Sequence, residues 1–307
     1  MEKELEIIAI GTIIKETIEF PTRTIGPVIG SPAAYSSLVM AAQGRKVGLV
    51  TYYGNDMDNI ISELDVLDRR GVMPYEYSTT NQLVYREDGT KYVVYQKAAP
   101  NICFQDIHPD YLKADYFKIC PMNYEVELDL VKELYERGKT IFVDLGGYGG
   151  ATSDVRHSVN EAYGKMVIET LCQNATIIKA SEEDLASIFP GKTVEEAVDY
   201  LVKAGAPNVV VTLGGKGALF KENEKEVQYI DSFHAVSENP DGSLDFTGAG
   251  DSFGAGFMAS YVKERDMRKA AVNGNATASL VIQKSGGCTL GRMPSRERVE
   301  KRIATGE

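Results

Sequence analysis

The clearest chemical pattern in the chain lies between positions 245 and 251, which read Asp-Phe-Thr-Gly-Ala-Gly-Asp. Three small residues, Gly248, Ala249 and Gly250, precede a run that predicts a helix over 252–264. Small residues let the backbone N–H groups at a helix start point to one place, and the helix dipole adds partial positive charge there. The pattern therefore predicts a cradle for an anion such as a phosphate group.

Asp251 ends this cradle. A carboxylate beside a bound phosphate can take a proton from an attacking hydroxyl, while the amides neutralise charge on the transferring phosphoryl group. A helix start in which Asp251 caps the first turn and the glycines permit close packing would use the same residues. The functional hypothesis is phosphoryl transfer, with Asp251 as the base and the amides of 248–250 as the anion hole. The structural alternative is that Asp251 only caps the helix.

This stretch resembles the C-terminal signature D-[TS]-T-G-A-G-D-x-F of the ribokinase-like (PfkB-type) carbohydrate and nucleoside kinases. Asp245, Thr247, the 248–251 segment and Phe253 match, whereas Phe246 departs from the signature. The resemblance covers essentially the whole chain. It implies one three-layer α/β/α domain over 1–307, with a mostly parallel central sheet and a small β-hairpin lid from segments around 12–30 and 75–100.

Three further stretches resemble nucleotide-binding parts of that family. A strand followed by a glycine-rich turn implies ATP contacts from Thr212, Gly214, Gly215 and Gly217. The segment 179–184 is similar to a K-x-N-x-x-E motif, which implies that Lys179 and Ser181 contact ATP and that Asp184 places Mg²⁺ through water. The small-residue helix around Asn275 is similar to one that lines the adenine pocket. A hairpin turn, a capping box at positions 181 and 184, and close helix packing are the respective structural alternatives.

The acceptor-binding signature departs from the family, in which G-G-x-x-x-N is usual. Here the stretch begins at Gly30 and Ser31 and ends at Tyr35, whose ring could stack on a sugar or a nucleobase. The resemblance also implies acceptor contacts from Glu16, from Asn55 in a turn, and from Asn123 after a strand, although an ordinary turn explains Asn55 equally well. Asp245, Thr247 and Gly286 fall in loops that hold a monovalent cation, K⁺ for example, in many relatives.

The resemblance implies an ATP- and Mg²⁺-dependent kinase that phosphorylates a hydroxymethyl-type hydroxyl of a sugar or sugar acid. Alternatives are a nucleoside or inositol kinase of the same family, and a non-catalytic ligand-binding or regulatory relative. The sequence lacks a complete Walker G-x-x-x-x-G-K-[ST] loop, a protein-kinase H-R-D loop and a G-x-G-x-x-G after the first strand. These absences argue against P-loop, protein-kinase and Rossmann-type dinucleotide chemistry.

The elements that must position these residues alternate between strand and helix. Strands are predicted at 5–14, 46–52, 114–120, 140–144, 175–179 and 208–213, and helices at 32–42, 126–137, 159–172, 182–188, 193–204, 252–264, 267–284 and 295–303. Gly11 and Thr12 break the first of these runs, which predicts a strand-end loop there. This alternation predicts a parallel sheet covered on both faces, with ligands at the carboxyl ends of its strands. Aromatic and β-branched runs around Asp88-Gly89 predict a hairpin flap, and 220–233 predicts a second hairpin.

Composition limits the partners. The 307 residues include 44 acidic and 33 basic side chains, a formal net charge of −11, which argues against a nucleic-acid partner. Four dispersed cysteines indicate neither a zinc site nor a disulfide framework. No segment approaches the ~20 apolar residues that a membrane span needs. We therefore expect a cytoplasmic enzyme with a small-molecule substrate and no membrane partner, and a homodimer formed through the exposed edge of the lid.

Overall fold

A computed structural model describes residues 5–87, 91–150, 161–223 and 225–306. Its main sheet has nine strands in the order β13-β12-β11-β10-β9-β8-β1-β4-β5. The strands from β11 to β5 run parallel, whereas β12 and β13 form the predicted second hairpin. The bounds are β1 (Ile7–Ile10), β4 (Val47–Gly54), β5 (Asp68–Tyr75), β8 (Tyr116–Ile119), β9 (Thr140–Asp144), β10 (Ile177–Ser181), β11 (Asn208–Thr212), β12 (Ala218–Glu222) and β13 (Gln228–Ile230).

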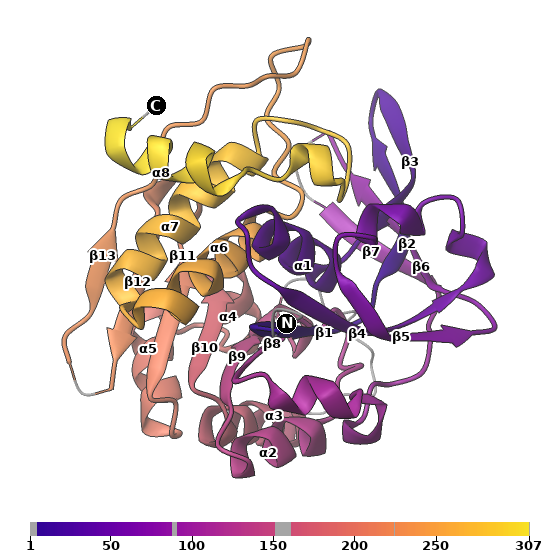
Figure 1. The fold of residues 1–307 in the computed structure, drawn as a ribbon. Helices are drawn as coiled ribbons and strands as arrows, with labels where there is room; N and C mark the ends of the chain where they lie inside the picture. Colours follow the sequence, from indigo (N-terminus) through magenta and orange to yellow (C-terminus); the bar gives the residue numbers. More distant parts are fainter. Residues whose placement is uncertain (1–4, 88–90, 151–160, 224, 307) are drawn as a thin grey trace.

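Helices cover both faces of this sheet (Figure 1). One face carries α1 (Pro32–Ala42), α6 (Ala249–Glu264) and α7 (Met267–Val281), with α8 (Arg296–Thr305) against α7; the other carries α2 (Leu128–Glu136), α3 (Glu161–Asn174), α4 (Glu182–Ile188) and α5 (Val194–Lys203). Successive strand residues point to opposite faces, so Ile7 and Ala9 join one core and Ile8 and Ile10 the other. The predicted three-layer α/β/α architecture is confirmed.

A second sheet of four strands, which we call the lid, has the order β3-β2-β6-β7. It consists of β2 (Ile14–Phe20), β3 (Arg23–Gly30), β6 (Thr79–Tyr85) and β7 (Lys91–Lys97), so it unites the two inserted segments that the resemblance implied. β6 and β7 pair antiparallel, as predicted for a hairpin. Figure 1 shows the lid beside α1, and β3 leads directly into that helix.

One predicted strand end is confirmed and one strand was missed. The apolar run 5–14 divides at the predicted strand-end loop of Gly11 and Thr12: β1 ends at Ile10, and β2 of the lid begins at Ile14. Gly11 permits a close approach to the end of β8, because a Cβ at this position would collide with the carbonyl oxygen of Cys120. The parallel edge strand β5 was missed because its first half, Asp68 to Arg70, is charged and resembles a loop.

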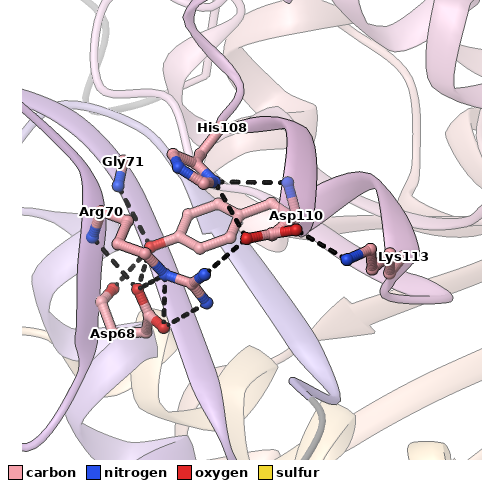
Figure 2. A network of polar contacts seen from close by, with 7 residues as sticks. Asp68, Arg70, Gly71, His108, Asp110 and Lys113 are labelled. Carbon is pink, nitrogen blue, oxygen red and sulfur yellow. Dashed lines mark hydrogen bonds and ion pairs between the residues drawn. The ribbon is translucent and has the colours of Figure 1, made fainter.

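A polar network holds this edge strand at the amino end of the sheet (Figure 2). Arg70 Nη2 lies 2.7 Å from Asp68 Oδ2, and Arg70 Nη1 lies 2.7 Å from Asp110, which also pairs with Lys113. The hydroxyl of buried Tyr111 donates to Asp68 Oδ1 at 2.9 Å. An open groove of about 840 Å³ is lined in part by Asp68, Arg70, Asp110 and Lys113. The charges of these four side chains are paired with one another. The network therefore joins β5 to the segment Pro109–Lys113.

Candidate active site

A cavity of about 350 Å³, here called the Lys179 cavity, opens at the carboxyl ends of β9, β10 and β11, beside the start of α6. Parallel sheets place ligands at this edge because the loops after their strands and the N-termini of their helices meet there. Of the residues implied to bind nucleotide or phosphate, the following line it: Lys179, Ser181, Asp184, Thr212, Gly214, Gly217, Asn275, Gly248, Ala249, Gly250 and Asp251.

A smaller cavity of about 90 Å³, the Tyr35 cavity, lies between the lid and the start of α1. Its lining comprises Glu16, Ser31, Pro32, Tyr35, Leu83, Tyr85, Tyr92, Val93, Met122, Thr247, Gly248 and Asp251. Asp251, Gly248 and Pro32 line both cavities. Asp251, in the first turn of α6 and half-buried, therefore stands where the two spaces meet.

The start of α6 is left open by a glycine cap. Gly248 has a φ of 76°, in the left-handed region, and offers no side chain to cover the amides of the first turn. A Cβ at this position would also lie 2.5 Å from the Tyr35 ring. The Ala249 amide donates to the carbonyl of Phe246 at 3.1 Å, so this member of the predicted anion hole is already engaged. An anion here would meet the Gly248 and Gly250 amides first.

Lys179 adds a full positive charge to this helix start. Its buried Nζ lies 3.0 Å from Oδ2 of Asp144, at the end of β9. Burial alone would lower the pKa of Lys179. The carboxylates of Asp144, Asp184 and Asp251 raise it by more than burial lowers it, so the pKa lies above its usual value. A Cβ on Gly250 would lie 3.3 Å from Nζ, so the ammonium group sits beside the cradle. Lys179 therefore stays charged at neutral pH.

Ser181 and Asp184 form a reciprocal capping box at the start of α4. Ser181 Oγ accepts from the Asp184 amide at 3.0 Å, and Asp184 Oδ2 accepts from the Ser181 amide at 2.7 Å. The structural alternative is thus present, yet the buried Asp184 also lines the Lys179 cavity. Mg²⁺ in phosphate sites takes one or two carboxylates, often through water, and its other ligands from phosphates. The residues present fit such an ion, with Asp184 as the residue that would hold it.

Two of the residues expected to bind ATP have structural partners. Nδ2 of Asn275 donates to the carbonyls of Ile230 and Asp231, at 3.3 and 3.0 Å, and so fastens the end of β13 at the cavity wall. Gly215 does not line the cavity, and its carbonyl accepts from Ser232 Oγ at 2.6 Å. Close packing, the alternative for the helix of Asn275, is also seen: a Cβ on Gly256 of α6 would lie 2.3 Å from Thr277 Oγ1.

The expected acceptor residues on β2, β3 and α1 converge on the Tyr35 cavity. Gly30 makes room for Glu16, because a Cβ at position 30 would lie 2.5 Å from Glu16 Oε2. Ser31 caps α1 by accepting from the Ala34 amide at 3.2 Å, in a positive-φ conformation that turns the chain from β3 into the helix. The departures from the family signature at Ser31 and Tyr35 thus lie at the cavity itself.

Asn55 and Asn123 line neither cavity, so this structure does not support their predicted acceptor contacts. Asn55 is exposed in a turn after β4, and the neighbouring Asp56 accepts from the Ser78 amide at 3.0 Å. The backbone amide of Asn123 donates to Glu125 at 2.7 Å. Both segments serve the turns around the site, which was the structural alternative for Asn55.

Sequence reasoning missed two polar contacts at the site. Lys179 and Asp144 pair across neighbouring strands, although position 144 carried no other signal than its place at a strand end. Tyr85 of the lid shares a 2.9 Å hydrogen bond with the Thr247 hydroxyl, and its ring stacks on Phe20 with centroids 4.9 Å apart. The alternation of the hairpin could have placed Tyr85 on an inner face, but not opposite Thr247.

The predicted monovalent-cation loop holds a protein side chain instead. Nη2 of Arg292 donates to the carbonyls of Asp245 and Thr247, at 3.0 and 3.1 Å, and Nη1 donates to the carbonyl of Gly287 at 3.0 Å. Oδ1 of Asp245 accepts from the Thr247 amide at 3.0 Å. Gly286 has a φ of 128°, and the five hydrogen bonds of this guanidinium go to other residues. Arg292 thus already donates to carbonyl oxygens of two of the three residues, Asp245 and Thr247, that the sequence assigned to a monovalent cation.

Comparison with known proteins assigns the family. The pattern of the pfkB family carbohydrate kinases matches residues 36–295. This chain belongs to that family. The pfkB-family chain is 29% identical to the cytidine kinase of Thermococcus kodakarensis over 292 residues, which are 93% of this chain and 99% of that protein.

Solved structures of the same fold cover nearly the whole pfkB-family chain. Arabidopsis thaliana ribokinase complexed with ribose and ATP superposes with a TM-score of 0.77 at 20% identity, over 98% of this chain and 99% of that one. A putative ribokinase II from E. coli in complex with ATP and Mg²⁺ gives a TM-score of 0.75 at 21% identity, with the same coverage.

The pfkB-family protein is accordingly a carbohydrate or nucleoside kinase, a phosphotransferase with an alcohol group as acceptor. Among the residues that the structure describes, none of the helices has the length and apolar character to cross a membrane.

Proposed function

We propose that this kinase transfers the γ-phosphoryl group of ATP to the hydroxymethyl hydroxyl of a nucleoside, with Asp251 as the base. One observation carries the proposal: Asp251 lines both cavities, one rimmed by the cradle at α6 and the other by the lid. A base in this position can reach a hydroxyl in the Tyr35 cavity that attacks a phosphate in the Lys179 cavity.

The lining of the Tyr35 cavity favours an uncharged acceptor. Its charged members are Glu16 and Asp251, and its described lining includes no lysine or arginine. A sugar acid would bring a carboxylate to two like charges, which is unfavourable. This argues against the sugar-acid part of our expectation from sequence.

Within the neutral acceptors, the rings at the cavity favour a nucleoside. The cavity offers apolar and aromatic surface on which a nucleobase can stack. This surface comes from Tyr35, Tyr85, Tyr92, Leu83 and Met122. The full-length relative described above carries the name cytidine kinase, in agreement with this class. A neutral pentose is the second candidate, supported by the Glu16 carboxylate as a hydroxyl acceptor and by the ribose in the ribokinase complex.

The chain's own groups divide the work of the transfer. Such reactions depend mostly on positioning and electrostatic stabilisation, because the transition state is loose and anionic. The Gly248 and Gly250 amides and the Lys179 ammonium neutralise charge on the phosphates, and Asp251 takes the hydroxyl proton. Asp184 would hold Mg²⁺, which would neutralise charge on the transferring phosphoryl group. The lid covers the acceptor and excludes water, which limits ATP hydrolysis.

We also propose that the protein works in the cytoplasm, where its four free cysteines stay reduced.

We further propose that the protein is a homodimer. β3 and β7 are the outer strands of the lid sheet, and each offers an edge for a second copy. Val94 and Tyr92 of β7 are also exposed. Light scattering that gives one 33.6 kDa chain, not two, would remove the dimer.

The function is tested by ADP release from Mg-ATP over a panel of nucleosides, neutral sugars, sugar acids and inositols. We expect turnover with a nucleoside, and a kcat that falls by about 10²–10⁴-fold in Asp251→Asn with MgATP affinity retained. Asp129→Asn is the matched control, since that side chain is 83% exposed on α2. Near-normal turnover of Asp251→Asn would remove Asp251 as the base, and saturable ATP binding without turnover on any acceptor would favour the non-catalytic alternative.

A further inference from the structure

Arg292 is a buried arginine, and all five of its N–H groups have acceptors. Nε donates to the carbonyl of Val281 at 3.2 Å, and Nη1 donates to the Tyr35 hydroxyl at 2.7 Å and to the Gly287 carbonyl at 3.0 Å. Nη2 completes the set with the carbonyls of Asp245 and Thr247. A guanidinium has five N–H donors in a rigid plane, so this site satisfies the whole group.

The oxygens around Arg292 form a site for a single positive charge. Four backbone carbonyls point to one place, and Asp245 Oδ2, buried and without a hydrogen bond, lies 3.6 Å from Nη2. Without a cation, the Asp245 carboxylate would be an uncompensated buried charge, which is strongly destabilising. Arg292 supplies that charge permanently, because a guanidinium does not lose its proton in proteins.

We propose that Arg292 is a tethered cation that positions the phosphate cradle and the Tyr35 cavity together, and that the enzyme therefore needs no free monovalent cation. The inference rests on the proposed function for its effect on turnover. The turn that Arg292 holds, 245–247, leads directly into Gly248 and the first turn of α6. The same guanidinium holds the hydroxyl of Tyr35, whose ring packs on Gly248.

A free K⁺ ion and Arg292 compete for the same oxygens. The carbonyls of Asp245, Thr247 and Gly287 already accept from the guanidinium, and its Cζ lies 5.6 Å from the centre of the Tyr35 ring. A metal ion could take these oxygens only if the side chain left, which would also release Tyr35. Arg292 is thus a positioning residue with a cation's role, and its removal should create a cation-dependent protein.

The first test uses the unaltered protein. The Kd of MgATP is measured by calorimetry, and the thermal midpoint by scanning, in KCl, NaCl and tetramethylammonium chloride of equal ionic strength. We expect Kd to agree within about twofold among the salts, and turnover of the acceptor found in the panel to agree likewise. An affinity or rate at least about fivefold higher in K⁺ would overturn the inference.

The second test compares Arg292→Ala and Arg292→Lys with the control Arg296→Ala, whose side chain is 48% exposed on α8. We expect Arg292→Ala to lose about 100-fold in kcat, and Arg292→Lys to lose less. K⁺ or millimolar guanidinium should restore part of the rate and raise the thermal midpoint of Arg292→Ala, whereas tetramethylammonium and urea should not.

The outcomes separate the inference from the proposed function. If no acceptor is phosphorylated, the proposed function fails, and recovery of the thermal midpoint of Arg292→Ala by K⁺ or guanidinium still decides whether Arg292 is a tethered cation. A folded Arg292→Ala that no small cation rescues in rate or midpoint would overturn the inference. If Arg292→Ala does not fold, Arg292→Lys and the salt comparison of the unaltered protein decide it.

Discussion

Single residues set the chemistry at the junction of the two cavities. Charges of both signs surround the first turn of α6. Lys179 on β10 and Arg292 in the turn 290–292 are positive, and Asp251 on α6 is negative. Glu16 is the second carboxylate of the Tyr35 cavity, and Gly30 provides the space for it. An ionised carboxylate accepts hydrogen bonds from hydroxyl groups, so Glu16 is suited to bind a ribose diol.

We expect Glu16→Gln to raise the acceptor KM by about tenfold or more, because a hydrogen bond to a charged group contributes about 1.5–3 kcal/mol. The Kd of MgATP should not change, since Glu16 does not line the Lys179 cavity. Glu19→Gln, on the same strand, is the control; its carboxylate accepts from Gln82. Steady-state kinetics of both variants would contradict the assignment if their acceptor KM values were equal.

At the scale of elements, a hydrogen bond joins the lid to the turn that precedes the cradle. Tyr85 of β6 reaches Thr247 in the turn before α6, 162 positions away. Burial raises the pKa of Tyr85, and its hydrogen bond with Thr247 offsets part of this rise. Tyr85 therefore stays protonated at neutral pH and can donate.

We expect Tyr85→Phe to raise the acceptor KM about fivefold, the effect of a hydrogen bond that contributes about 1 kcal/mol. ADP release without acceptor should also increase, because a loosened lid admits water. Tyr135→Phe removes a hydroxyl from an exposed side chain of α2 that lines neither cavity, and it serves as the control. Unchanged KM and unchanged ATP hydrolysis in Tyr85→Phe would show that this contact does not close the site.

At the scale of the whole molecule, the amino end of the sheet contributes stability away from the chemistry. Burial opposes ionisation of Asp68, but hydrogen bonds from Arg70 and Tyr111 outweigh it and lower the pKa of Asp68 to about 2. An aspartate in the unfolded chain has a pKa of about 3.9. The stabilisation is therefore fully present above about pH 4 and is lost as the pH falls through about 2.

We expect Asp68→Asn to lower the thermal midpoint by about 2–4 °C at pH 7, the effect of about 1 kcal/mol for a partly exposed network in a chain of this size. The difference in thermal midpoint between Asp68→Asn and the unaltered protein should stay constant from pH 7 to 4 and shrink below pH 4. Asp65→Asn, whose side chain is 60% exposed, is the control, and kcat should be unaffected. A gap as large at pH 2.5 as at pH 7 would refute the ionic origin.

Local patterns in the sequence predicted much of the architecture and part of the candidate site. The bounds of α1 and α4, the hairpins, and the helix at the phosphate cradle follow from neighbouring residues alone, because caps, turns and periodicity act over a few positions. The same holds for the capping box at Ser181, whose members are three residues apart. The position of Asp251 at a helix start was therefore predictable.

Contacts between distant segments could not be read from the chain. Arg292 lies in a short Leu-Gly-Arg turn with no periodicity, yet it meets carbonyls 45 and 47 positions earlier and a hydroxyl 257 positions earlier. The pairing of Lys179 with Asp144 depended on strand order, and the end of β1 on the close approach of Cys120 to Gly11. Sequence patterns report neighbours along the chain, whereas the partners of Arg292 and the lid contact of Tyr85 depend on which segments pack together in space.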